Sequence, residues 1–163
     1  MFKIVFATVL MLLSPAAVAT PLFQGTSTDM TVSEVLTTVP DAKQVHDPES
    51  GFGPLAPCLA RIDNYTIGAR RFEVCFIFEN ERLKSVMMRM IDKPLRLDYN
   101  DLVNSVRSKY GPEIGEAPSE LGRRADWVTK DGTDISINWF NNSLLQGLNI
   151  VYSAKAASEA GKL

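Results

Sequence analysis

The sequence has few of the residues from which catalytic and metal centres are usually built. Its 163 residues include one histidine, His46, and two cysteines, Cys58 and Cys75. A zinc site usually needs three or four ligands at regular spacing, and no second His or Cys pair accompanies His46. The sequence also lacks a nucleophile elbow, an HExxH motif and a glycine-rich phosphate loop. These absences predict a protein that holds no cofactor and no metal and is not an enzyme.

One catalytic alternative depends on His46. This residue lies near Asp47 and Glu49 in a segment, residues 40–57, that contains four prolines and two glycines. His46 could bind a metal with the two carboxylates, or act as the base for Cys58 or a serine. The protein would then be a small secreted hydrolase or metal-dependent enzyme. We favour a solvated surface loop, because Asp-Pro and Ser-Gly steps are typical of turns.

Positively and negatively charged residues are nearly equal in number. Lys and Arg number 17, Asp and Glu number 19, and the formal net charge is −2. The local basic pairs, Arg70-Arg71 and Arg123-Arg124, stand among acidic and apolar residues. Because nucleic-acid binding needs clustered cations, no nucleic-acid partner is expected.

No apolar run in the sequence is long enough to span a membrane. The longest run lies at the start of the chain. Lys3 is followed by an apolar run from Ile4 to Leu13, then by Ser14-Pro15 and by Ala17-Val18-Ala19. A run of ~10 residues is too short to span a bilayer, but it fits the apolar region of a secretory signal peptide. We therefore expect residues 1–19 to be removed near Ala19, and the protein to be periplasmic or secreted. The residue directly after Ala19 is Thr20 and not a cysteine, so a lipid anchor is not expected. No later apolar run is longer, so membrane insertion is not expected either.

Export affects the two cysteines, because disulfides persist in oxidising compartments. Cys58 and Cys75 flank a predicted hairpin whose turn is centred near Thr66-Ile67, so the two side chains could meet across neighbouring strands. The sequence favours a disulfide and leaves two unbonded thiols as the alternative.

Two helices are predicted from caps and apolar spacing. Thr31 and Glu34 form a capping box, and the apolar face that follows ends at Pro40. The second helix has Asp98 or Asn100 as its cap and Gly111-Pro112 as its end. The two apolar faces consist of Val32, Val35, Leu36 and Val39 in the first helix, and of Leu102, Val103, Val106 and Tyr110 in the second.

Six strands are predicted where the apolar period changes to two. The strongest signal places Phe72, Val74, Phe76 and Phe78 on one face of a strand. Residues 40–57 and 112–122 lack periodicity and are predicted loops, and residues 154–163 are a predicted flexible tail. The predicted strands are 59–65, 71–78, 83–90, 124–129, 135–139 and 144–152.

The two halves of the chain repeat one pattern. Residues of the first helix align with the second at an offset of 71, and the second and third strands of each half align at offsets of 63 and 62. The prediction is one α+β domain, residues 20–153, with half-units at about 30–92 and 98–153. Two short helices pack on one face of a mainly antiparallel sheet, built from a tandem α-β-β-β duplication.

Short motifs add a resemblance to a known group. The segment from Gly25 to Pro40, with Met30-Thr31-Val32-Ser33-Glu34-Val35 at the helix start, resembles small exported bacterial proteins of the SmpA/OmlA group. Lys109-Tyr110-Gly111-Pro112 is the equivalent motif in the second half. These proteins share the helix-plus-antiparallel-sheet fold of beta-lactamase inhibitor protein. The resemblance implies a binding module whose exposed sheet face engages other proteins.

Alternation along the strands identifies the residues of that face. If the phenylalanines of the second strand lie under the helices, their neighbours point away from them. Arg, Met, aromatic and apolar residues among them are suited to protein contact. The function predicted is an inhibitor, immunity or envelope accessory protein that binds another protein. Its expected contact residues are Arg71, Glu73, Ile77, Met87, Arg89, Asn138 and Phe140.

Overall fold

The computed structural model describes residues 19–46, 57–119, 122–142 and 145–155. Within these residues the strands form one eight-stranded sheet with the order β1-β2-β3-β4-β8-β7-β6-β5, and every neighbouring pair is antiparallel. The α+β class, the antiparallel sheet and the two helices are therefore as predicted. The elements are α1 (Val32–Thr38), β1 (Lys43–Gln44), β2 (Cys58–Ile67), β3 (Arg70–Glu79), β4 (Arg82–Met90), α2 (Arg96–Tyr110), β5 (Gly115–Ser119), β6 (Gly122–Val128), β7 (Thr133–Asn141) and β8 (Gln146–Ala154).

The prediction of six strands was too low by two edge strands. Strand β1 lies in the predicted loop 40–57 and pairs with β2, while β5 lies in the predicted loop 112–122 and pairs with β6. Both are at an edge of the sheet, where one side of the backbone is unpaired and no apolar alternation is required. Pro118 of β5 suits this position, because proline cannot donate a hydrogen bond to a second neighbouring strand.

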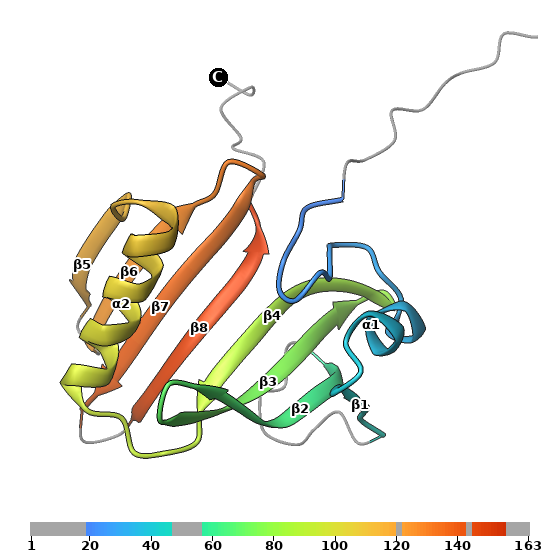
Figure 1. Ribbon diagram of the computed structural model, residues 1–163, viewed down its shortest axis with the longest axis horizontal. Coiled ribbons are helices and arrows are strands. Elements are labelled where there is room, and N and C mark those ends of the chain that lie inside the picture. The colour runs from blue at the N-terminus through green and yellow to red at the C-terminus, as the bar shows by residue number, and fades with distance from the viewer. Residues whose placement is uncertain (1–18, 47–56, 120–121, 143–144, 156–163) are drawn as a thin grey trace, which may run out of the picture.

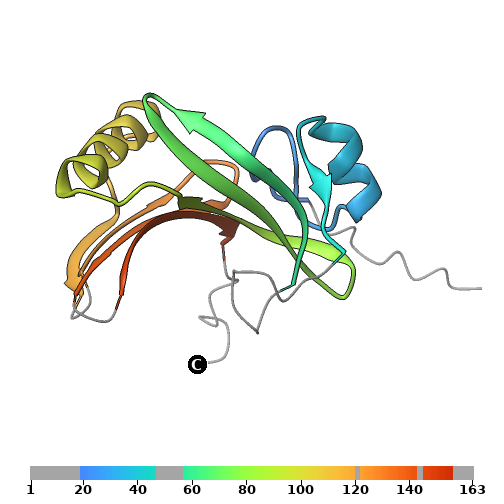
Figure 2. The same cartoon turned by 90° about the horizontal axis from the view of Figure 1, so that it is seen from below.

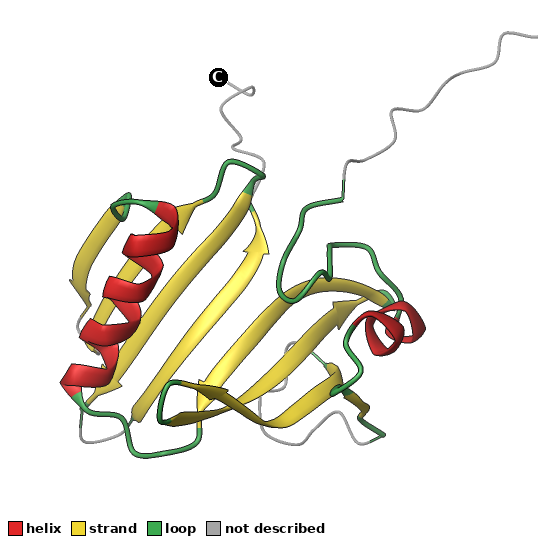
Figure 3. Ribbon diagram, in the orientation of Figure 1, coloured by secondary structure: helices red, strands yellow, loops and turns green. Residues whose placement is uncertain are grey.

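Both helices lie on the same side of the sheet, α1 over the first half and α2 over the second (Figures 1 and 3). Figure 2 shows the opposite side without a helix, and strands β7 and β8 arch so that the hollow of the arch faces away from α2. The sheet therefore has a helix-covered face and a helix-free face, and the core lies on the former.

The helix-covered core joins the two halves. The predicted strand face of Phe72, Val74, Phe76 and Phe78 is buried as expected. Val35 of α1 and Val103 of α2 belong to the same cluster of buried side chains. Each half alone would leave a large part of its apolar surface in water, so packing into one core stabilises both.

The segment before α1 covers the middle of this face. The ring of Phe23 lies 5.4 Å from that of Tyr65 and 5.8 Å from that of Tyr152. Thr133 donates a hydrogen bond to the carbonyl of Pro21, which ties the segment to β7. Residues far apart in the sequence are thus joined where β4 and β8 meet.

The start of α2 differs from the prediction. The helix begins at Arg96, with Leu95 as N-cap, and Asp98 lies in the first turn. The Asp98 carboxylate accepts a hydrogen bond of 2.7 Å from the Leu95 amide, so it caps the helix from within the first turn rather than preceding it. Helix α1 follows its predicted capping box, in which Thr31 and Glu34 bond each other's amides.

Candidate functional site on the helix-free face

Three rows of cross-strand neighbours define the helix-free face. Because side chains alternate along a strand, residues two positions apart share a face. The rows cross the five strands β3, β4, β8, β7 and β6, and each consists of consecutive Cα partners. The central row is Cys75, Met87, Val151, Ser136 and Asp126; the rows beside it are Glu73, Arg89, Asn149, Asn138 and Arg124, and Ile77, Ser85, Ser153, Asp134 and Val128.

The middle of the face is apolar. Met87 of β4 and Val151 of β8 are direct partners and are half-buried. Their neighbours in the flanking rows are polar, namely Arg89 and Asn149 on one side and Ser85 and Ser153 on the other. An apolar centre with a polar margin is the usual anatomy of a protein–protein contact surface.

The polar margin on the first half is a network of ion pairs. One carboxylate oxygen of Glu73 forms an ion pair with the Arg89 guanidinium at 2.6 Å, and the other forms one with the Arg61 guanidinium at 3.3 Å. Arg61 also binds Asp63 at 2.8 Å. Since Glu73 is held by cations from two neighbouring strands, its side chain is fixed in place by contacts within the protein.

The second half has a similar arrangement. Arg124 and Ser136 both donate to the carboxylate of Asp126. Beside them, the Asn138 amide donates to the Asn149 side-chain oxygen at 3.0 Å. These contacts fix side chains that would otherwise lose rotamer freedom on binding, and preorganisation of this kind lowers the entropic cost of association.

A disulfide joins Cys58 of β2 to Cys75 of β3, with Cα atoms 5.6 Å apart. Cys58 lies opposite Ile77, while Cys75 lies opposite Arg61, so the two cysteines are diagonal neighbours and not a direct pair. The register shift between Cys58 and Ala60 brings them together, and the hairpin turn lies at Gly68-Ala69 instead of Thr66-Ile67. The disulfide that the sequence favoured is therefore present. Its cysteines are not a direct cross-strand pair, because β-bulges shift the register of β2 against β3.

The disulfide is the centre of a small apolar cluster on the helix-free face. Cys58, Cys75 and Ile77 are buried there, and Val45 and Met87 pack against them. Ile77, 7% exposed, therefore belongs to the interior of this cluster. Cys75 and Met87 also belong to the central row, so the cluster continues directly into the middle of the face.

The structure brings most of the predicted contact residues together. Glu73, Arg89 and Asn138 share one row, and Met87 lies in the next. Phe140 lies farther along β7, opposite Gly147 and Gly122. Whether these residues contact a partner stays a prediction. Arg61 and Arg124 also lie on this face but are not among the predicted contact residues. Both alternate with small or apolar residues in predicted strands, and this alternation is a signal that could have identified them.

Arg71 lies at the margin and is held by Asp92. Its guanidinium donates to the carboxylate at 2.8 Å and its amide donates at 3.2 Å. These hydrogen bonds lower the pKa of Asp92, with the guanidinium the larger cause. The lowered pKa means that the ion pair persists until the pH falls below the ordinary range of an aspartate.

Replacement Arg71→Gln is expected to raise the pKa of Asp92 towards its ordinary value. The hydrogen bond from the backbone amide of residue 71 to Asp92 remains, so part of the lowering of the Asp92 pKa persists. An NMR titration of the Asp92 carboxyl carbon measures the change, with Arg89→Gln as the control that leaves Asp92 unaffected. An unchanged pKa of Asp92 in Arg71→Gln would show that the guanidinium does not hold this carboxylate.

His46 is exposed at the end of a described stretch, and Asp47 and Glu49 lie outside the described residues. Among the residues that the structure describes, no group of three His, Cys, Asp or Glu side chains lies close enough to hold a metal ion. The cysteine that His46 could have activated is bonded in the disulfide.

Comparison of the chain with protein-family models, with curated proteins and with solved structures finds no match. Neither helix within the described part of the chain is long and apolar enough to cross a membrane.

Proposed function

We propose that this chain is an exported, non-enzymatic module that binds another protein through the helix-free face of its sheet. The observation that carries this proposal is the apolar pair Met87–Val151 at the middle of a polar face whose side chains are already fixed by hydrogen bonds and ion pairs. An inhibitor, an immunity protein or an envelope accessory factor would use such a face in the same way.

The distribution of charge on this face supports a protein as the partner. Its cations and carboxylates are interleaved, as in the Arg61–Glu73–Arg89 network and in the Arg124–Asp126 pair. A phosphate-rich partner would require cations without carboxylates beside them. Mixed charges around an apolar centre instead provide specific pairing with a surface of mixed charge.

The disulfide supports export. A bond between Cys58 and Cys75 persists in the periplasm or outside the cell, and reducing systems in the cytosol would act against it. Together with the signal-peptide pattern of residues 1–19, this supports a partner in an oxidising compartment as part of the proposal.

A tandem duplication, and with it the likeness to the SmpA/OmlA and beta-lactamase-inhibitor folds, is also part of this proposal, and the strand register supports it. Val74 pairs with Met88 in the first half, and Ile137 pairs with Ile150 in the second. The second pair lies 63 and 62 positions beyond the first, which are the offsets at which the two halves of the sequence align. Met88 and Ile150 are also partners across the β4–β8 junction, as a two-fold relation between the halves requires.

A triple variant, Met87→Ser with Arg89→Ala and Asn138→Ala, tests the proposed face. Envelope and culture extracts of the source organism are passed over immobilised protein, and retained proteins are identified by mass spectrometry. We expect the triple variant to lose the partner that the wild type retains, because truncation removes the apolar centre and two polar neighbours.

The matched control truncates three exposed residues of α2, with Asn104→Ala, Ser108→Ala and Lys109→Ala. The control variant should keep the partner, and circular dichroism should show that both variants are folded. Equal retention by the face variant and the wild type would refute the proposed surface.

A further inference from the structure

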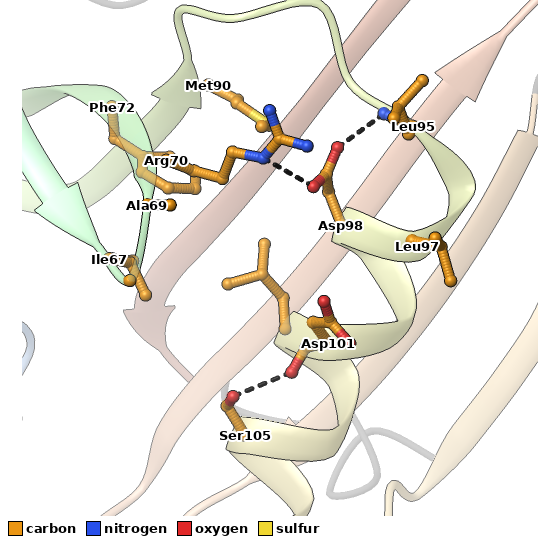
Figure 4. A pocket seen from close by; sticks show the side chains of 12 residues that line it. Ile67, Ala69, Arg70, Phe72, Met90, Leu95, Leu97, Asp98, Asp101 and Ser105 are labelled. Carbon is orange, nitrogen blue, oxygen red and sulfur yellow. Dashed lines mark hydrogen bonds and ion pairs between the residues drawn. The ribbon is translucent and has the colours of Figure 1, made fainter.

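A pocket of about 380 Å³ opens on the other side of the sheet, between the tip of the β2–β3 hairpin and the first turns of α2 (Figure 4). Its volume lies in the range of roughly 300–1,000 Å³ that is usual for small-molecule sites. It is lined from three directions, by the hairpin residues Ile67–Arg70, by Met90 at the end of β4 and by α2 with the residues before it. The pocket is thus separate from the proposed protein-binding face.

The floor of the pocket is apolar and buried. Phe72, Met90 and Leu102 line it, and each is buried in the core with less than a tenth of its surface exposed. Leu95 and Leu97 stand at the mouth and are 52% and 67% exposed. Removing apolar surface from water is favourable, so binding of an apolar ligand that covers these leucines is favoured.

One wall is a fixed ion pair. Arg70 donates from Nε to Asp98 at 2.8 Å, and the second oxygen of Asp98 accepts the Leu95 amide at 2.7 Å. Asp98 is 7% exposed, so its charge is compensated by Arg70 and both its oxygens are engaged. This pair closes one end of the pocket, and Figure 4 shows it beside Met90.

Asp101 sets the charge of the site. It lies one turn beyond Asp98 on α2, lines the pocket and is exposed. Within the described residues, its carboxylate makes no hydrogen bond or ion pair, whereas its backbone carbonyl accepts the Ser105 hydroxyl at 2.8 Å. Since Arg70 and Asp98 compensate each other, the charged residues of the lining leave one net negative charge.

We propose that this pocket binds a cationic amphiphile, with the apolar body on Phe72, Met90 and Leu102 and the cationic group beside Asp101. An anionic amphiphile is disfavoured, because two carboxylates and one guanidinium line the pocket and the guanidinium is already paired. Covering the exposed Leu95 and Leu97 above the apolar floor supplies most of the affinity, and the Asp101 carboxylate supplies the selectivity for charge.

Titration with decyltrimethylammonium and with decanoate, both below their micellar concentrations, tests this assignment. The two probes have alkyl chains of similar length and opposite charge. NMR shifts of the Leu102 and Met90 methyl groups report binding at the pocket itself. We expect saturable shifts with tighter binding of decyltrimethylammonium, and Asp101→Asn should weaken it about fivefold, the size of a typical exposed charge interaction, without weakening decanoate.

A second variant keeps the test independent of charge. Ala69→Trp at the hairpin tip should fill the pocket and abolish the saturable shifts, whereas Thr66→Trp, an exposed residue of the same hairpin outside the lining, should leave them intact. Absence of saturable shifts in the wild type would overturn the proposal. Tighter binding of decanoate, or binding that survives Ala69→Trp, would do so as well.

Discussion

Replacement Trp127→Ala is expected to lower the free energy of unfolding by about 4 kcal/mol, the cost usual for deleting a large buried aromatic side chain. Trp127 of β6 is 1% exposed and is among the largest fully buried side chains of the described residues. Its indole Nε1 donates at 3.0 Å to the carbonyl of Gly111, the C-cap residue of α2. The truncation therefore leaves a cavity under the second helix and removes the partner of a carbonyl at the helix end.

Trp127→Phe is the matched control that separates these two contributions. Phenylalanine keeps much of the apolar volume and loses the hydrogen bond, so it should cost about 1–2 kcal/mol. Urea unfolding followed by circular dichroism measures both variants, and the fluorescence of Trp139 provides a second probe. A loss below about 1 kcal/mol for Trp127→Ala would mean that the cavity collapses or that the indole is not packed as described.

The core was largely predictable from the sequence, because burial imposes a period. Alternating Phe72, Val74 and Phe76 identified the inner face of β3, and Ile135 and Ile137 did so for β7. The edge strands were not predictable, since an exposed strand such as β1 has no buried face and hence no apolar pattern. The helix start at Arg96 was also missed, because Leu95 is not a typical N-cap residue and Asp98 caps from the first turn.

The sequence predicts which face of the sheet each residue of the candidate site occupies. It does not predict which residues lie next to each other across the strands. Alternation alone indicates that Glu73 and Arg89 point away from the helices. Their alignment with Asn149 and Asn138 depends on register, and on the pairing of β4 with β8, which lie far apart in the sequence. Bulges near Cys58, between Ile62 and Tyr65, and near Ile77 shift the register without a turn residue to mark them.

The two proposed sites use opposite sides of one sheet, and the β2–β3 hairpin contributes to both. Arg61 and Glu73 belong to the helix-free face, whereas Ala69 and Arg70 at the tip line the pocket beside α2. A ligand in the pocket can influence the other face through this hairpin and through β4, which ends at Met90 in the pocket lining and carries Met87 and Arg89 on the helix-free face. The disulfide joins the two strands of the hairpin at the opposite end, so it limits how far such a change can extend.

Removal of the disulfide by Cys58→Ala with Cys75→Ala is expected to lower the free energy of unfolding by about 3 kcal/mol, the chain-entropy value for a loop of this length. The bonded residues are separated by 17 positions, and the bond constrains this loop in the unfolded chain. Cys75 is also the direct neighbour of Met87, so we expect the double variant to bind the proposed partner more weakly. Unfolding of the wild type with and without a reductant is the matched measurement, because the reductant should destabilise the wild type and leave the double variant unchanged. Two alkylated thiols in the intact mass of the protein purified without reductant would contradict the bond.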